Sequence, residues 1–210
     1  MILEAYYLHY FSALIEGNKD ECSKVINNLL HEKVDIKDIY TQIVKRSMYR
    51  IGQMWENDKV NIAVEHRATK ITEIIINQIY QYIQAIPKHG KKVVVTCADK
   101  EFHELGARMV SDIFELNGWD STFLGANTPS NELLNIIEEV NPEVVAISIN
   151  FYINIVRLLK EIEMISERFP EIKIIVGGQA FADGKEDVLA NYPNVTFISC
   201  LYTLEDLIKQ

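Results

Sequence analysis

The sequence predicts a protein of class α and α/β, in which an N-terminal helical bundle precedes a domain built on a five-stranded parallel sheet. Three observations predict it. Residues 1–86 repeat apolar side chains at helical spacing, and they contain no proline. A short polar segment, 87–91, then holds both proline and glycine. Beyond it, short apolar runs alternate with amphipathic segments, the pattern of a sheet with helices between its strands.

The first part, 1–86, is expected to be a bundle of four or five helices that acts as a cap domain. Apolar side chains recur three or four residues apart in Tyr7-Tyr10-Leu14, Ile39-Ile43 and Ile71-Ile75-Ile79. The pattern breaks at 18–20 and at 34–36, where Asp20 and Asp35 are predicted N-caps.

The second part, 91–210, is expected to be a flavodoxin-like (Rossmann-like) domain. The predicted strands are 92–97, 121–125, 143–149, 172–177 and 195–199, and the predicted helices are 105–117, 130–140, 152–168, 185–191 and 203–209. The third and fourth strands are mainly apolar, in Val144-Val145-Ala146-Ile147 and Ile174-Ile175-Val176, as expected for parallel strands buried on both faces. Five such strands with alternating helices favour the order 2-1-3-4-5.

Composition restricts the function. The 210 residues carry 30 acidic and 21 basic side chains, a net charge of -9 that disfavours binding to nucleic acid. Cys22, Cys97 and Cys200 are expected to be reduced thiols. With neither a signal peptide nor an apolar stretch of membrane-spanning length, the chain is expected to be soluble and cytoplasmic.

The predicted strand order has its switch point between strands 1 and 3, so the loops after strands 1, 3 and 4 should converge. They carry His103, then Ser148-Ile149-Asn150, then Gly177-Gly178-Gln179. An imidazole there is well placed to hold a metal-bearing cofactor, and glycines allow a ligand to approach the main chain. His9, His31 and His89 lack the spacing of a zinc site.

Three elements together resemble the cobalamin-binding fold: Glu101-Phe102-His103-Glu104-Leu105-Gly106, Ser148, and Gly177-Gly178. The resemblance implies that His103 replaces the benzimidazole of the cofactor as the lower axial ligand of cobalt, while the displaced tail occupies a slot. It assigns cofactor contacts to Glu101, Phe102, Leu105, Gly106, Ser148, Ile149, Asn150, Gly177, Gly178 and Gln179. Two alternatives stay open for Glu101, which either orients His103 or is a solvated loop carboxylate.

The helical part contains Trp55 and, after nine intervening residues, Glu65-His66. Alone, Trp55 would be interpreted as a core residue, but the spacing resembles the cap of the CarH/LitR-type adenosylcobalamin photoreceptors. That resemblance places Trp55 over the upper corrin face, with Glu65 and His66 around the adenosyl group. Two departures stand out: the sequence begins in the bundle, without the DNA-binding domain of those proteins, and Glu56 replaces their second cobalt-ligating histidine.

The resemblance implies a cobalamin-binding sensor or regulatory module that holds adenosylcobalamin, and it suggests a light response as in the photoreceptors. Methylcobalamin and hydroxocobalamin are the other candidate forms. The alternative is a corrinoid carrier of a methyltransferase system. A third, weaker interpretation is an interaction protein without cofactor. A sensor or carrier needs no catalytic activity of its own. Expected partners are a second copy of the chain or a separate regulatory or methyltransferase protein.

Overall fold

The computed structural model describes residues 2–181 and 184–209, which fall into two compact units, Met1–Ala85 and Ile86–Gln210. Residues 1, 182, 183 and 210 of the predicted domains lie outside the described residues. Within the described ranges, no helix combines the length and the apolar composition needed to cross a membrane.

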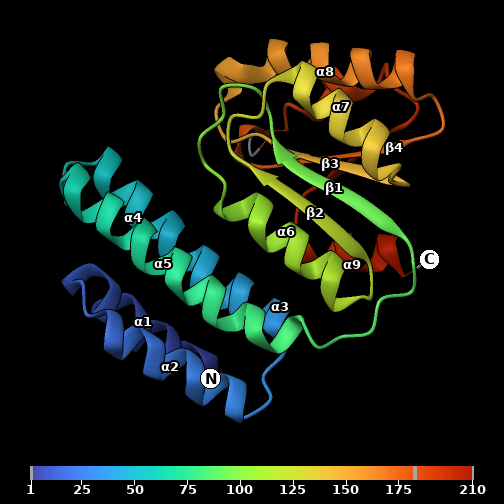
Figure 1. Ribbon diagram of the computed structural model, residues 1–210. Coiled ribbons are helices and arrows are strands. Elements are labelled where there is room, and N and C mark those ends of the chain that lie inside the picture. The colour runs from blue at the N-terminus through green and yellow to red at the C-terminus, as the bar shows by residue number, and fades with distance from the viewer. Residues whose placement is uncertain (1, 182–183, 210) are drawn as a thin grey trace. The chain divides into compact units, whose positions relative to one another are not determined.

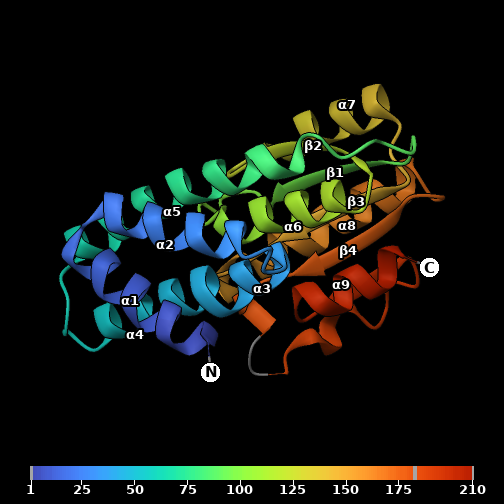
Figure 2. The same ribbon diagram turned by 90° about the horizontal axis from the view of Figure 1, so that it is seen from below.

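The first unit is a helical bundle (Figures 1 and 2). It consists of α1 (Ile2–Glu16), α2 (Lys19–His31), α3 (Ile36–Asp38), the π-helical segment η1 (Ile39–Lys45), α4 (Arg46–Glu56) and α5 (Ile62–Ile83). Its core is made by the recurring apolar positions, so that Tyr10, Leu14, Ile43, Ile75 and Ile79 are fully buried. The predicted bundle is therefore confirmed.

The breaks in the bundle are set by capping side chains. Asp35 caps α3, as predicted, by accepting a hydrogen bond from the backbone N–H of Lys37 at 2.8 Å. The prediction that Asp20 caps α2 was wrong. Asn18 is the N-cap, with its side-chain oxygen 3.1 Å from the N–H of Glu21, so the helix begins earlier and Asp20 lies in its first turn.

The second unit is a five-stranded parallel sheet of order β2-β1-β3-β4-β5, as predicted. The strands are β1 (Lys92–Cys97), β2 (Asp120–Gly125), β3 (Val144–Ser148), β4 (Lys173–Gly177) and β5 (Val195–Ile198). Helices α6 (Leu105–Leu116) and α9 (Leu201–Ile208) cover one face, and α7 (Ser130–Val140) and α8 (Ile155–Arg168) cover the other (Figure 1). Two helices on each face explain why the central residues of β1, β3 and β4 are apolar and buried.

Two predicted helices differ in the structure. Residues Tyr152–Asn154, expected to begin a helix, form the short 3-10 helix η2 that leads into α8. The helix predicted at 185–191 is only the 3-10 turn η4 (Glu186–Leu189), which follows the 3-10 turn η3 (Gln179–Phe181). Lys185 provides no side-chain cap for η4, and Pro193 prevents helix continuation, so the segment is too short for a stable α-helix.

The cysteines described in the structure are free thiols. Cys22 and Cys97 are buried, and burial raises the pKa of each thiol to about 12. Cys200 differs because it is only partly buried at the N-terminus of α9.

Candidate functional site

The carboxyl ends of three strands lie in register at one edge of the sheet. Cys97 of β1 is paired with Ser148 of β3, which in turn is paired with Gly177 of β4. The alignment continues beyond the strands. The N–H of Ala98 donates to the carbonyl oxygen of Ser148 at 3.0 Å, and the N–H of Ile149 donates to the carbonyl oxygen of Gly177 at 2.9 Å. The three loops therefore begin side by side, at the edge where parallel α/β sheets bind ligands.

Glu101 connects the loop after β1 to the loop after β3. Its side chain has no solvent exposure. Oε1 accepts hydrogen bonds from the N–H groups of Phe102 and His103, at 3.0 and 3.1 Å, and Oε2 accepts those of Asn150 and Phe151, at 2.9 and 3.0 Å. Glu101 is therefore not a solvated loop carboxylate, one of the two alternatives that the sequence left open.

The same carboxylate holds the imidazole of His103. Burial alone would raise the pKa of Glu101, but the hydrogen bond with His103 and the backbone N–H groups outweigh it and lower the pKa to about 2. An ionised carboxylate only accepts hydrogen bonds. The 2.7 Å contact between Oε1 and Nδ1 of His103 therefore places a proton on Nδ1.

The imidazole ring of His103 is held in one orientation but remains accessible to solvent. Its side chain is 50% exposed, whereas that of Glu101 beneath it is 0% exposed. The ring of Phe151 packs edge-on against the imidazole, with centroids 4.7 Å apart. The buried thiol of Cys97 lies 3.6 Å from the His103 carbonyl oxygen. The surroundings thus orient the imidazole while leaving part of it at the surface.

The glycines at this edge have different neighbours. Gly178 has φ +122°, and a Cβ there would lie 2.0 Å from the carbonyl oxygen of Ile149, so this glycine permits close packing of the β3 and β4 loops. At Gly106 a Cβ would meet only the Ser148 hydroxyl, at 3.9 Å. The N–H of Gln179 donates to the side-chain oxygen of Asn150 at 3.4 Å. Leu105, the first residue of α6, is partly buried.

Exposed apolar side chains follow β1 and β3 in the chain, and Phe151 among them packs against His103. The sequence analysis predicted only Phe102 of this group. The others lie in the loop after β3 and in the first turn of α8, and the exposed fractions of the group are Phe102 64%, Phe151 51%, Tyr152 39%, Ile153 88% and Val156 73%. An apolar run in a loop directly after a buried strand was the signal that could have identified them. Such a cluster is typical of a binding surface.

The loop after β2 also joins this edge, which the sequence did not indicate. The N–H of Asn127 donates to the carbonyl of Glu101 at 2.9 Å, and that of Ala126 donates to the Glu104 carboxylate at 2.9 Å. Asn127 has φ +54°, and its buried side-chain oxygen has no hydrogen-bond partner among the described residues. A buried oxygen of this kind is suited to a polar ligand group.

The bundle residues singled out in the sequence lie at one end of the hairpin formed by α4 and α5. Trp55 is in the last turn of α4 and is 42% exposed, so it is not a core residue. Glu56 ends that helix and is exposed. Glu65 and His66 lie near the start of α5, and Nε2 of His66 is 3.8 Å from Oε2 of Glu65. The carboxylate of Glu65 also accepts a hydrogen bond from the hydroxyl of Thr69 at 2.9 Å.

Comparisons with known proteins agree with these observations. One family model, described as a B12 binding domain, matches residues 91–206, and a second model of the same description matches residues 9–80. The HTH-type transcriptional repressor CarA of Myxococcus xanthus is 30% identical over 90 residues, 43% of this chain. Those residues span only 31% of the length of the repressor.

Solved structures share the fold. The Methanosarcina barkeri monomethylamine corrinoid protein has a TM-score of 0.78 at 14% identity, over 98% of this chain and 97% of the other. The methanol:cobalamin methyltransferase complex MtaBC from Methanosarcina barkeri has a TM-score of 0.53 at 16% identity, over 98% of this chain and 78% of the other. Because the B12 binding domain model covers 91–206, more than half of the 210 residues, this chain belongs to the B12-binding domain family, and its ligand is cobalamin.

Proposed function

We propose that His103 is the lower axial ligand of the cobalt of a bound cobalamin. The observation that carries the proposal is the 2.7 Å contact between Nδ1 of a half-exposed His103 and the buried carboxylate of Glu101. With its proton on Nδ1, the neutral imidazole presents the lone pair of Nε2 to a metal. The carboxylate fixes this tautomer and raises the basicity of the ring, as carboxylates behind metal-binding histidines do.

The residues around His103 fit the rest of the cofactor. A corrin ring is large and mostly apolar, which suits the exposed side chains of Phe102, Phe151 and Ile153. We assign the polar tail to the loops that carry Gly106, Ser148, Gly177 and Gly178, and the orphaned oxygen of Asn127 supports a polar ligand group there. Cobalamin supplies a reactive bond between cobalt and its upper ligand.

We further propose that the chain is a sensor or regulatory module that responds to the adenosyl form. Trp55, Glu65 and His66 would select the upper ligand, as the resemblance to the photoreceptor cap suggests. The similarity to the CarA repressor also supports a regulatory role. A change of upper ligand, by light or by exchange, would alter self-association or the docking of a separate regulator. Because Glu56 stands where the photoreceptors have a histidine, a photoproduct with two histidine ligands is not part of this proposal.

A second candidate is a corrinoid carrier that works with methyltransferase proteins. The fold match to the monomethylamine corrinoid protein over nearly the full length of both chains favours it. The two candidates differ in the upper ligand. A carrier would bind methylcobalamin and hydroxocobalamin as tightly as adenosylcobalamin, whereas the sensor would prefer the adenosyl form.

Reconstitution with adenosylcobalamin tests the proposal. Wild-type protein should show the ultraviolet-visible spectrum of histidine-ligated, base-off cobalamin in darkness, and His103→Ala should lose it. His31→Ala, which changes an exposed histidine of α2, is the matched control and should keep the wild-type spectrum. Unchanged cobalt ligation in His103→Ala would refute the ligand assignment.

The sensor role has its own test. Wild-type holoprotein is exposed to green light, and its spectrum and elution volume in size-exclusion chromatography are compared with those of a dark sample. Both should change if light is the signal. An unchanged spectrum and elution volume would remove the light-sensing version while leaving the cobalamin site in place.

A further inference from the structure

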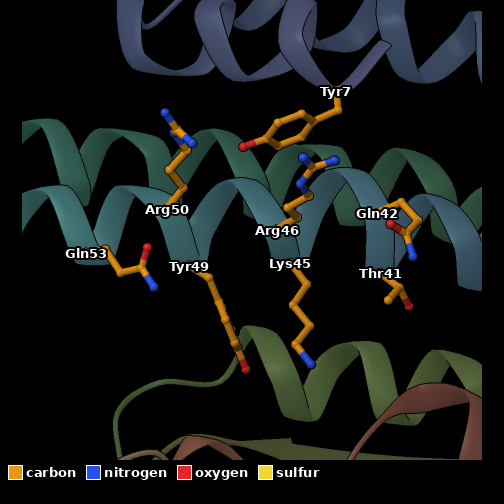
Figure 3. Close-up of a pocket in the computed structure, with 8 residues that line it drawn as sticks. All are labelled: Tyr7, Thr41, Gln42, Lys45, Arg46, Tyr49, Arg50 and Gln53. Atoms are coloured by element: carbon orange, nitrogen blue, oxygen red, sulfur yellow. The ribbon is translucent and has the colours of Figure 1, made fainter. Parts of the chain in front are cut away.

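The helical bundle contains a pocket of its own (Figure 3). Its volume is about 510 Å³, and the described residues that line it are Tyr7, Thr41, Gln42, Lys45, Arg46, Tyr49, Arg50 and Gln53. They come from α1, η1 and α4, so the first unit supplies all of them. The pocket is an open groove on the surface of the bundle, bordered by exposed side chains such as Tyr49 and Arg50, and its volume is large enough for a small molecule.

The charge of this pocket is opposite to that of the protein. Lys45, Arg46 and Arg50 line it, and none of the described lining residues is acidic, although the chain has a net charge of -9. In the part of the chain that the structure describes, Lys45 and Arg50 have no ion-pair partner. Instead they lie over aromatic rings, Lys45 5.1 Å from the centroid of Tyr49 and Arg50 5.1 Å from that of Phe11. Figure 3 shows that Arg46 and Arg50 point to the side of α4 on which Tyr7 lies, whereas Lys45 points to the opposite side. Lys45 and Arg50 therefore place positive charge on two sides of the pocket.

The third cation is held in place. Arg46 donates two hydrogen bonds to the Glu4 carboxylate, at 2.5 and 3.0 Å, and its guanidinium lies 3.7 Å from the centroid of the Tyr7 ring. These contacts use Nη1 and Nη2, and a guanidinium has five N–H donors, so donors remain for a ligand. Because Arg46 is already ordered, binding would cost little side-chain entropy at this position.

The π-helical segment η1 and the helix α4 that follows it supply all of the lining residues except Tyr7. Thr41, Gln42 and Lys45 lie in η1, and Arg46, Tyr49, Arg50 and Gln53 follow in α4. A π-helical turn is wider than an α-helical one, and such turns are frequent at functional sites. The buried hydroxyl of Thr41 has no hydrogen-bond partner among the described residues. The pocket thus combines cations with an unused polar group.

We propose that this pocket binds a small soluble molecule that carries a phosphate group. Arginine suits phosphate through paired N–H donors, and lysine adds a point charge. The tyrosine rings and the two glutamine side chains would contact the remainder of such a molecule. A polyanion such as nucleic acid is disfavoured, because beyond the pocket it meets the field of a strongly acidic protein, whereas a small dianion meets only the local cations.

Isothermal titration calorimetry of the apoprotein, residues 1–210, with pyrophosphate at constant ionic strength tests the proposal. Wild type should bind one pyrophosphate with a saturable isotherm. Lys45→Gln and Arg50→Gln should each weaken binding about tenfold, which corresponds to about 1.4 kcal/mol, since each removes a charge-assisted interaction with the phosphate. The matched control Lys59→Gln removes the same charge from an exposed position of the same unit and should bind like wild type.

Three results would overturn the proposal. They are the absence of saturable binding to wild type, an equal loss in Lys59→Gln, and wild-type affinity in both pocket variants. Co-sedimentation with phosphatidylglycerol vesicles distinguishes a soluble phosphate from a lipid headgroup. If the protein sedimented with the vesicles in a way that depends on Lys45 and Arg50, but did not bind pyrophosphate, the pocket would bind a membrane surface and the proposal of a soluble ligand would be wrong. The readout uses apoprotein, so it does not depend on the cobalamin site.

Discussion

Replacing Glu101 by glutamine keeps the shape of the side chain but removes half of its acceptors. In the structure each carboxylate oxygen accepts two backbone N–H groups, and Oε1 also accepts Nδ1 of His103. The amide NH₂ of glutamine must face one of these sets of donors. At least two buried N–H groups then lose their acceptor, at about 1–3 kcal/mol each, so Glu101→Gln should lower the free energy of unfolding by about 2–6 kcal/mol.

Urea unfolding of the apoprotein at neutral pH, followed by circular dichroism, measures this loss. Glu171→Gln, which changes an exposed carboxylate of the same unit, is the control and should stay within about 0.5 kcal/mol of wild type. Glu101→Asp keeps the charge but shortens the reach by one methylene, so we expect an intermediate loss. If Glu101→Gln were as stable as the control variant, the reasoning that Glu101 holds two loops together would be refuted.

Three further predictions concern other parts of the chain. Burial raises the pKa of Glu161 from 4.5 to about 7, so the folded protein retains a proton that the unfolded chain has lost, and stability should fall as pH rises between these values. Between these pH values the wild type should lose about 3 kcal/mol of its free energy of unfolding, and Glu161→Gln should not. Urea midpoints are measured at pH 5 and pH 8, and an equal shift in the wild type and in Glu161→Gln would contradict the prediction. Gly178→Ala should destabilise the protein by about 3 kcal/mol in thermal unfolding because its Cβ would meet Ile149, whereas Gly52→Ala, in an open helical position, should stabilise it by about 0.5–1 kcal/mol. Trp55→Ala should reduce the preference for adenosylcobalamin over hydroxocobalamin roughly tenfold in equilibrium binding, and an unchanged ratio of affinities would remove the role of this side chain.

Local patterns were sufficient for the architecture. The apolar strands β1, β3 and β4 indicated a sheet covered on both faces, and the order that follows from this brought the correct loops to one edge. Spacing also identified the bundle. The spacing did not indicate η1, because the four-residue separation of Ile39 and Ile43 is also the spacing of an α-helix.

The hydrogen bonds within the site could not be predicted from the sequence. A glutamate after a strand is usually solvated. Glu101 is buried because, in addition to its neighbours Phe102 and His103, the distant N–H groups of Asn150 and Phe151 donate to it. The same holds for Asn127, whose loop is fixed by the carbonyl of Glu101. Hydrogen bonds between segments far apart in the chain leave no periodic signal.

Electron paramagnetic resonance of the cob(II)alamin-loaded protein tests the ligation by His103 most directly. A single axial ¹⁴N nucleus splits each cobalt line into a triplet, and a ¹⁵N nucleus splits it into a doublet. Protein labelled with ¹⁵N only in histidine should give doublets, and labelled His103→Ala should not. Triplets from the labelled wild type would show that the cofactor keeps its own benzimidazole on cobalt, which contradicts the account.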